Sequence, residues 1–344
     1  MEENNLKDID IKIKSVACKR LQEIKKKLIS KKYLIIICGP TASGKSQTAL
    51  ILAKLFDTNI ISADSMQAYI GMDIGTDKKD FKKYGVTQFL TDICSPDHFL
   101  TSFEYRDKAR KIINEEFFSK KMIPIIAGGS GLHIRAITDD LMTAPEGSHL
   151  LRNKIKKNIN EEGLNYFYEK LKKIDPEYAE KISSNDERRI IRALEVFEVT
   201  GKKFSEFQVK WQERKSIYEC IFIGLYSERK KLYENIEKRV TKMIEDGLLD
   251  EVKTLVSSGY ADTFSLRQAI GYKELLKYLN RETTFNFAVD EIKKNTRHLA
   301  KKQYTWFNAD DRINWITTDN YDNIYNLIGE ILNIINLRIL NGKN

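Results

Sequence analysis

The sequence predicts an α/β protein in which a parallel sheet is flanked by helices and an all-helical domain is inserted into the chain. Short, fully apolar runs such as residues 33–38 end at glycine, which is typical of buried strands in a parallel sheet. Segments with helical spacing of apolar residues separate these runs, as in repeated strand–helix–strand units. Between about residues 140 and 211 only helical patterns remain. A chain of 344 residues that is 42% hydrophobic is long enough for two packed units.

The first elements follow one another at short intervals. Residues 6–32 place apolar side chains at mostly three-to-four spacing among lysines, which predicts an amphipathic helix that is solvated or partly docked. Further on, apolar runs predict strands and periodic apolar positions predict helices. These patterns give a strand at 33–38, a helix at 45–56, strands at 59–62 and 88–93, a helix at 103–119, a strand at 122–127 and a helix from about 132.

The helical block comes next, with helices expected at 150–161, 164–174 and 188–200, the last stopped by Gly201. A strand at 218–225 returns the chain to the sheet, a helix over 232–255 follows, and most of the remaining chain has helical patterns. This order predicts four parts. They are an N-terminal extension (1–32), a core (33–140 plus 212–330), a helical insertion (141–211) and a C-terminal tail (331–344).

The charge balance admits an anionic partner without choosing one. The chain has 58 Lys and Arg against 49 Asp and Glu, a net charge of +9. Residues 1–32 hold ten basic side chains against five acidic ones, whereas residues 141–210 hold fourteen against twelve. Nucleic-acid binding by the insertion would therefore depend on a few placed arginines and not on bulk charge.

Cysteine usage and hydropathy indicate the reducing cytoplasm. The cysteines stand far apart, without the spacing of a zinc site or a disulfide framework: Cys18, Cys38, Cys94 and Cys220. The acidic start and alternating charge argue against a signal peptide. No apolar run approaches the roughly 18 residues that a membrane helix needs, so we expect a cytoplasmic protein with no membrane partner.

One motif predicts phosphate binding. It matches G-x-x-x-x-G-K-[ST] at every fixed position and consists of Gly39, Pro40, Thr41, Ala42, Ser43, Gly44, Lys45 and Ser46. It lies between a buried strand and a helix, where loop N–H groups and the helix N-terminus converge on phosphate oxygens. Lys45 would neutralise the outer phosphate and Ser46 would hold Mg²⁺. The motif predicts a P-loop NTPase-like sheet, with 33–140 plus 212–330 as a P-loop catalytic core.

A carboxylate follows the second strand. Asp64 comes directly after residues 59–62, at the sheet edge on which α/β proteins bind ligands. Such a carboxylate can hold a metal, accept a proton or simply cap a turn, and position alone leaves these roles open. A P-loop kinase or ATPase usually adds an apolar strand that ends in Asp. The nearest candidate, residues 89–92, is only partly apolar, which weakens that assignment.

Six stretches together resemble one family, the tRNA dimethylallyltransferases, also called tRNA isopentenyltransferases. The resemblance runs from about residue 33 to residue 316 and points to the bacterial form. Its stretches are Gly39 to Ser46, Ile61-Ser-Ala-Asp-Ser65, Gly71-Met-Asp-Ile-Gly-Thr76, Gly128-Gly-Ser-Gly-Leu132, Arg192-Ala-Leu-Glu-Val196 and Ala269-Ile-Gly-Tyr-Lys273. It implies transfer of the dimethylallyl group of dimethylallyl diphosphate to N6 of adenosine 37, next to the tRNA anticodon. The products would be N6-(dimethylallyl)adenosine and diphosphate.

The resemblance also assigns roles to residues. Asp64 matches the general base, while Lys45 and Arg239 match the cations on the diphosphate, with Mg²⁺ as cofactor. Ser130 falls where the family generally has Thr lining the reaction channel. An adenine in an anticodon loop must be extruded from its stack before it can react.

Three segments match those that contact the tRNA anticodon stem-loop in the family. They are Asp64, Ser65, Met66 and Gln67; Arg188, Arg189, Ile190, Ile191 and Arg192; and Gln268, Ala269, Ile270, Gly271, Tyr272 and Lys273. The insertion would then be an all-helical tRNA-binding domain. The arginines have an alternative structural role, salt bridging to Asp186 and Glu187.

Two departures and two alternatives accompany this interpretation. His133 stands where the family generally has Tyr, and Asn308 where Arg is usual. We expect a monomer. One alternative is an adenine-nucleotide isopentenyltransferase, which the long insertion disfavours because a small acceptor needs no such surface. The other is a P-loop kinase or an ATP-binding, NTP-dependent RNA-binding protein, which the setting of Asp64 disfavours.

Overall fold

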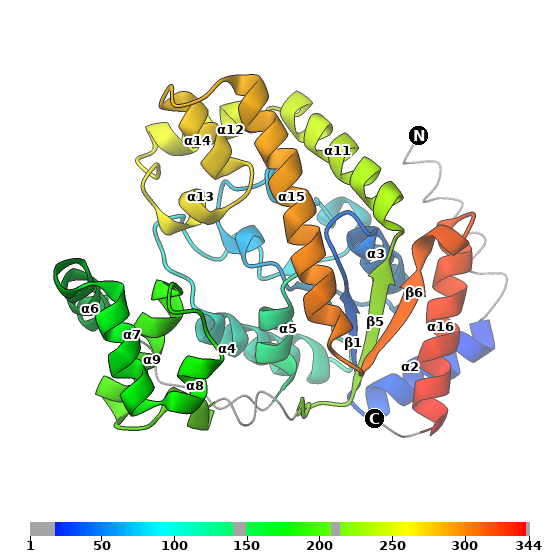
Figure 1. Ribbon diagram of the computed structural model, residues 1–344. Coiled ribbons are helices and arrows are strands. Elements are labelled where there is room, and N and C mark those ends of the chain that lie inside the picture. The colour runs from blue at the N-terminus through cyan, green and yellow to red at the C-terminus, as the bar shows by residue number, and fades with distance from the viewer. Residues whose placement is uncertain (1–17, 140–148, 208–213, 342–344) are drawn as a thin grey trace. The chain divides into compact units, whose positions relative to one another are not determined.

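The chain divides into two compact units (Figure 1). A computed structural model describes residues 18–139, 149–207 and 214–341. The larger unit comprises Met1–Thr138 and Tyr218–Asn344, and the smaller unit, Asp139–Ile217, is inserted between these segments. The predicted boundaries, 140/141 and 211/212, lie outside the described residues.

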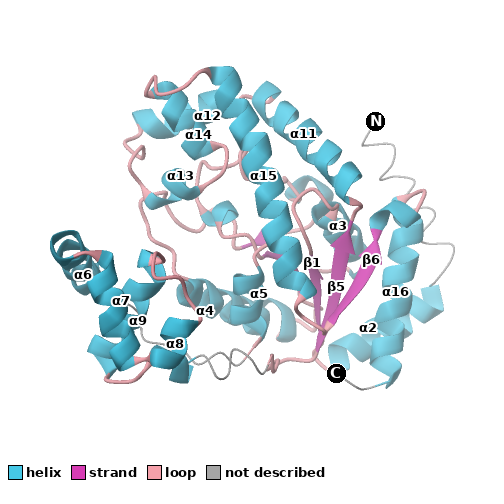
Figure 2. Ribbon diagram, viewed as in Figure 1, coloured by secondary structure: helices cyan, strands magenta, loops and turns pink. Residues whose placement is uncertain are grey.

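The larger unit contains a six-stranded sheet whose neighbouring strands are all parallel (Figure 2). Its order is β3-β2-β4-β1-β5-β6, so β1 is central and buried along its whole length. Alternate residues of β1 enter two different hydrophobic cores, one on each face of the sheet. The strands are β1 (Leu34–Cys38), β2 (Ile60–Ser62), β3 (Gln88–Phe89), β4 (Ile125–Gly128), β5 (Cys220–Tyr226) and β6 (Ile313–Thr317).

Helices cover both faces of the sheet. One core includes residues of α2 (Cys18–Ser30), α3 (Lys45–Phe56) and α16 (Ile324–Asn341), and the other includes residues of α4 (Ser102–Ile112) and α5 (Gly131–Thr138). A third core is formed mainly by helices at the carboxyl edge of the strands. These helices are α11 (Arg229–Glu245), α12 (Leu248–Ser257), α13 (Phe264–Gln268), α14 (Tyr272–Leu279) and α15 (Phe285–Asn308).

The smaller unit is helical in its described part, as the sequence predicts. Its helices are α6 (His149–Glu162), α7 (Leu164–Ile174), α8 (Pro176–Glu180) and α9 (Glu187–Thr200). The Asp186 side chain caps α9 by accepting the Arg189 N–H at 3.1 Å. Gly201 ends the helix with a φ of 69°, which is the expected stop. Buried apolar residues of α6, α7, α8 and α9, together with Ile182, form the core of this unit.

The helices near the two chain ends pack on the same hydrophobic core. The expectation of a tail at 331–344 is wrong, because α16 continues to Asn341 and buries Ile331 and Ile335 against the sheet. The described part of the N-terminal extension, α2, is docked on the same core through Ile24 and Leu28. Both ends thus help to close one face of the sheet.

Three further elements differ from the prediction. The edge strand β6 lies in the last part of the chain, most of which has helical patterns, and no strand was predicted there. The strand predicted at 88–93 stops at Phe89, because Leu90 and Asp92 adopt positive φ angles of 65° and 54°. The helix predicted at 232–255 breaks into α11 and α12 at Gly247, whose φ is 98°.

The docking of α2 can be tested by Leu28→Ala. Leu28 is 0% exposed, so we expect a loss of about 2–5 kcal/mol in the free energy of unfolding, measured by urea denaturation. Lys26, which is exposed on the same helix, gives the matched control, Lys26→Ala, with an expected change within about 0.5 kcal/mol. Equal stabilities of the two variants would contradict the docking.

Candidate active site

The predicted phosphate-binding loop joins β1 to α3. At Gly39, which has a φ of 137°, an added Cβ would lie 2.3 Å from the carbonyl oxygen of Leu225 in β5. Glycine is therefore required where the loop leaves the sheet. Gly44 precedes the first turn of α3, and Lys45 and Ser46 are its first residues. The N-terminus of α3 thus faces the space enclosed by the loop, as anion binding requires.

Two cations meet at this loop. The Arg239 guanidinium from α11 donates to Thr41 Oγ1 at 2.9 Å and lies 3.5 Å from the Asp77 carboxylate. The Lys45 ammonium donates to the Pro40 carbonyl at 2.5 Å. Burial, and secondly the charge of Arg239, lower the pKa of Lys45 to about 8. An anion bound here would meet two positive charges that the protein keeps close together.

Asp64 lies beside these cations at the end of β2. Its Oδ1 accepts the Met66 N–H at 3.0 Å, so the carboxylate caps the turn that follows the strand. Burial raises the pKa of Asp64, while the Met66 N–H and the charges of Arg239 and Lys45 oppose the rise. The side chain also lines the cavity described below. Asp64 can therefore cap the turn and still present its carboxylate to a ligand in the cavity.

The loop after β4 is hydrogen-bonded to the turn that follows β2 and, through Gln303, to the phosphate-binding loop. The Ser130 N–H donates to the Ala63 carbonyl at 3.1 Å, next to Asp64. Gln303 from α15 accepts the Thr41 N–H at 2.8 Å and donates to the Gly129 carbonyl at 3.0 Å. One amide side chain thus fixes the distance between the phosphate-binding loop and the Gly129 loop.

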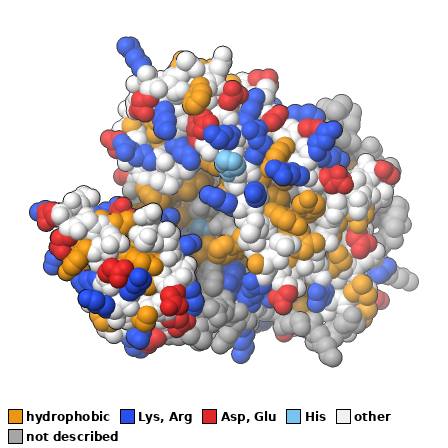
Figure 3. Space-filling model, in the orientation of Figure 1, with side chains coloured by type: hydrophobic (Ala, Val, Ile, Leu, Met, Phe, Trp, Pro, Cys, Tyr) orange, Lys and Arg blue, Asp and Glu red, His pale blue; other side chains and the backbone are white. Residues whose placement is uncertain are grey.

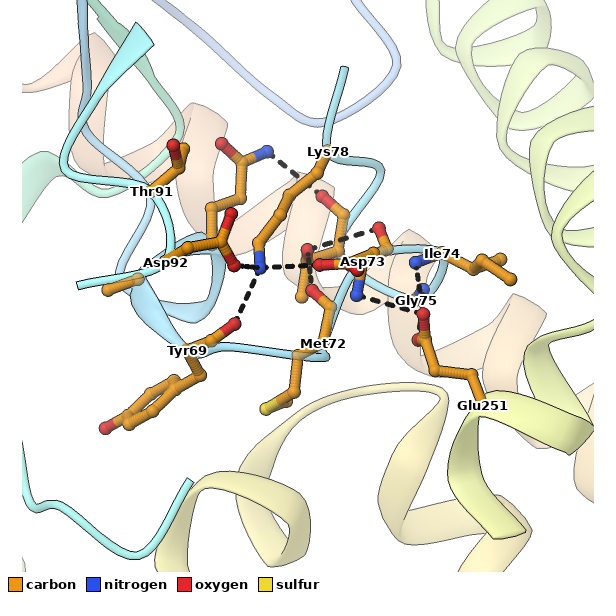
Figure 4. A network of polar contacts seen from close by, with 12 residues as sticks. Tyr69, Met72, Asp73, Ile74, Gly75, Lys78, Thr91, Asp92 and Glu251 are labelled. Carbon is orange, nitrogen blue, oxygen red and sulfur yellow. Dashed lines mark hydrogen bonds and ion pairs between the residues drawn. The ribbon is translucent and has the colours of Figure 1, made fainter. Parts of the chain in front are cut away.

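A second network holds residues 73–78 (Figure 4). The Glu251 carboxylate from α12 accepts the N–H groups of Asp73, Ile74 and Gly75 at 3.0, 2.7 and 3.2 Å. Lys78 bridges Asp73 and Asp92 at 2.7 and 2.6 Å and also donates to the Tyr69 carbonyl (Figure 4). These contacts set the path of the segment that carries Asp77 to the Arg239 guanidinium.

All these elements border one cavity of about 470 Å³ within the larger unit. Its walls include two carboxylates (Asp64 and Asp77), three cations (Lys45, Arg239 and Lys302), several hydroxyls and an apolar side formed by α11 and α15. The predicted site residues that line it are Thr41, Lys45, Ser46, Asp64, Ser65, Met66, Gln67, Ser130, Arg239, Gln268, Ala269, Ile270 and Gly271. Those of the same segments that do not line it are Gly39, Pro40, Ala42, Ser43, Gly44, Tyr272 and Lys273.

Tyr272 has a structural position. It belongs to a segment that matches the tRNA contacts of the family, but its side chain is fully buried and its hydroxyl donates to Glu251 at 2.5 Å. Tyr272 therefore supports the Glu251 network and does not line the cavity.

The arginine segment lies in the smaller unit. Ile190 and Ile191 are buried in its core, so only the arginines of this segment can reach a partner. Arg189 pairs with Asp186 at 3.4 Å, and Arg192 pairs at 3.0 Å with Glu195. Arg188 is exposed and makes no ion pair with the described acidic side chains. Salt bridging to Asp186, the alternative role of these arginines, therefore accounts for Arg189.

The helix α15 contributes to the cavity in a way that no sequence motif predicts. Gln303, Leu299, Lys302 and Trp306 line the cavity, and Leu299 and Trp306 remain 38% and 42% exposed. Lys and Arg side chains gather beside hydrophobic ones on the face over α15 (Figure 3). The indole of Trp306 lies over Gly131, where an added Cβ would be 1.9 Å from it. The sequence does not predict this contact, because Gly131 and Trp306 are far apart in the chain and neither residue indicates its partner.

Comparison with protein families places most of the chain in one family model. Residues 67–310 match the model described as IPP transferase, and residues 32–88 match isopentenyl transferase. A tRNA dimethylallyltransferase of Thermoanaerobacter sp. (strain X514) is 44% identical over 303 residues, covering 87% of this chain and 96% of that protein. One from Caldanaerobacter subterraneus is 45% identical over 292 residues, covering 84% and 92%.

Solved structures resemble the fold as well. The full-length tRNA isopentenylpyrophosphate transferase of Bacillus halodurans is 37% identical, with a TM-score of 0.66 over 90% of this chain and 98% of that one. A eukaryotic dimethylallyltransferase acting on tRNA is 26% identical, with a TM-score of 0.75 over 91% of this chain and 80% of that one.

Glu251→Gln tests the network around residues 73–78. A glutamine amide cannot accept all the N–H groups that the carboxylate accepts, so we expect faster hydrogen exchange in peptides covering residues 73–75. The matched control is Asp250→Asn, because Asp250 is exposed on the same helix and its side chain pairs with Lys253. Unchanged exchange in Glu251→Gln would mean that the loop does not depend on this carboxylate.

Proposed function

Because the chain belongs to the tRNA dimethylallyltransferase family, we propose that it transfers the dimethylallyl group of dimethylallyl diphosphate to N6 of adenosine 37 in tRNA. One observation carries this proposal. Asp64, a half-buried carboxylate with a raised pKa, lines the same cavity as Lys45 and Arg239. A proton acceptor and a cationic site for a leaving diphosphate are therefore present together.

The reaction needs both groups. An exocyclic adenine amine is a weak nucleophile, so removal of its proton by Asp64 favours attack on the allylic C1 carbon. The N6–C1 bond forms as the C1–oxygen bond to diphosphate breaks, and the electron pair of the broken bond leaves with the diphosphate. Lys45 and Arg239 stabilise the charge that develops on that group.

Mg²⁺ is part of the proposal, and the side chains fit it. The Ser46 hydroxyl lines the cavity, and the Ser43 hydroxyl is buried with no hydrogen-bond partner among the described residues. The described residues contain no group of three or more His, Cys, Asp and Glu side chains suited to a metal. Ser46 and the oxygens of the diphosphate would therefore hold the ion. When bound, Mg²⁺ neutralises part of the charge on the leaving group.

The anticodon loop of the tRNA would be recognised through its unpaired bases. The cavity walls formed by residues 64–67 and 268–271 support a site for one extruded base. The exposed Lys302 and the half-exposed Trp306 on α15 are suited to phosphate and base stacking, respectively. Arg188 of the smaller unit offers a further phosphate contact.

One copy of the chain would suffice, because a single unit supplies every wall of the cavity. In the described part of the chain no helix is long and apolar enough to cross a membrane. Among the described residues, Cys38, Cys94 and Cys220 form no disulfide bond, which is compatible with the proposed cytoplasmic location.

The assignment is tested by offering different acceptors. The protein is incubated with labelled dimethylallyl diphosphate, Mg²⁺ and either an anticodon stem-loop RNA or AMP. We expect label in the RNA and none in AMP. Transfer to AMP alone would favour an adenine-nucleotide isopentenyltransferase, and ATP hydrolysis without prenyl transfer would favour a P-loop kinase or NTP-driven protein.

The pH dependence reports on Lys45. The folded-state pKa of its ammonium is lowered to about 8, and only the charged form neutralises the diphosphate. We therefore expect kcat/KM for dimethylallyl diphosphate to fall about tenfold per pH unit above about pH 8. In Lys45→Arg, whose guanidinium stays charged, this alkaline fall should move beyond pH 10 although the rate is lower. A flat wild-type profile up to pH 10 would contradict the role of Lys45.

A further inference from the structure

A hydrogen bond inside the cavity wall joins Ser130 to His133. The Ser130 hydroxyl lies 2.5 Å from Nδ1 of His133, which is one turn further along, in α5. The Ser130 backbone is already fixed by its N–H contact to the Ala63 carbonyl. Its side chain, however, has no β-branch, so the backbone alone leaves the direction of the hydroxyl open. The bond to His133 selects one direction.

His133 is itself held rigidly. Only 8% of it is exposed, and its ring packs edge-to-face on Tyr105 with ring centres 4.6 Å apart and planes at 76°. Tyr105 is fully buried, and its hydroxyl donates to the Ser62 carbonyl at 2.6 Å. A chain of contacts therefore runs from the strand end before Asp64, through two rings, to the hydroxyl of Ser130.

The ring is uncharged at neutral pH. Burial lowers the pKa of His133 to about 4, so one ring nitrogen carries a proton and the other can accept a hydrogen bond. In the tautomer with the proton on Nε2, which the proposal below requires, the Ser130 hydroxyl donates to Nδ1. The oxygen of Ser130 is then left to accept a hydrogen bond from the cavity that it lines.

We propose that His133 is a positioning residue that fixes the Ser130 hydroxyl as a hydrogen-bond acceptor for the amine of the base being modified. This rests on the proposed function. The amine carries two hydrogens. While Asp64 takes one, Ser130 would accept the other and turn the nitrogen lone pair toward the allylic carbon. His133 acts only through Ser130 and touches neither substrate.

The departures from the family at positions 130 and 133 then form a pair. A Thr at position 130 would have its χ1 angle restricted by its own β-branch. This chain has Ser there and supplies the restriction from outside, through the ring nitrogen of His133. On this proposal, the ring nitrogen of His133 compensates for the missing β-branch at position 130.

The test uses the full-length protein and transfer to an anticodon stem-loop RNA. His133→Phe keeps the ring contact with Tyr105 and removes Nδ1. We expect kcat to fall by about tenfold, the order of one hydrogen bond, with KM for dimethylallyl diphosphate within about twofold. Ser130→Ala should give a similar fall, and the double variant no further fall. Ser130→Thr in the His133→Phe background should restore most of the rate.

The results separate a failure of the proposed function from a failure of the proposed role of His133. No transfer by the wild-type protein would overturn the proposed function. Wild-type transfer with an unchanged kcat in His133→Phe, or losses that multiply in the double variant, would overturn the role of His133 alone. If His133→Phe does not fold, His133→Asn and His133→Gln replace it, because only Asn keeps an acceptor near the Nδ1 position. A clearly higher kcat for Asn supports the proposal, and equal values overturn it.

Discussion

The parallel pairing of β4 between β1 and β2 is the constraint on which the site depends. In this register Cys38 lies opposite Gly128, and Ser62 lies opposite Ala127. Three chain segments therefore leave the sheet at the same edge and at nearly the same level. They are the phosphate-binding loop, the turn that holds Asp64 and the loop that holds Ser130. A shift of one residue in any of these pairings would turn the side chains to the opposite face.

Burial then gives these side chains their chemistry. In a site of low dielectric the charged forms of Lys45 and Asp64 are both disfavoured, so the pKa of the amine falls and that of the carboxylate rises. Their opposite charges partly offset this cost, and Asp77 does the same for Arg239. The result is a base that binds a proton more readily than an exposed Asp, beside cations that face an anion.

The sequence predicts the parts of this site that depend on local patterns. The position of Lys45 follows from a motif with a fixed relation to a strand and a helix, and that of Asp64 from the end of an apolar run. Gln303, and Glu251 with Tyr272, could not be predicted in the same way. Their partners lie 262, 178 and 21 residues away, and a single amide or carboxylate on a helix carries no sign of its target. The helix α16 was missed as part of the core because its apolar face has meaning only against the sheet.

The most direct test of the central claim is the single-turnover rate of prenyl transfer by Asp64→Asn. Asparagine keeps the oxygen that caps the Met66 N–H, so the turn is preserved and only the proton acceptor is lost. If Asp64 is the base, the rate should fall by roughly 10²–10⁴-fold, while binding of stem-loop RNA and of dimethylallyl diphosphate is retained. A rate near that of the wild-type protein would mean that Asp64 only caps the turn, and would contradict the account.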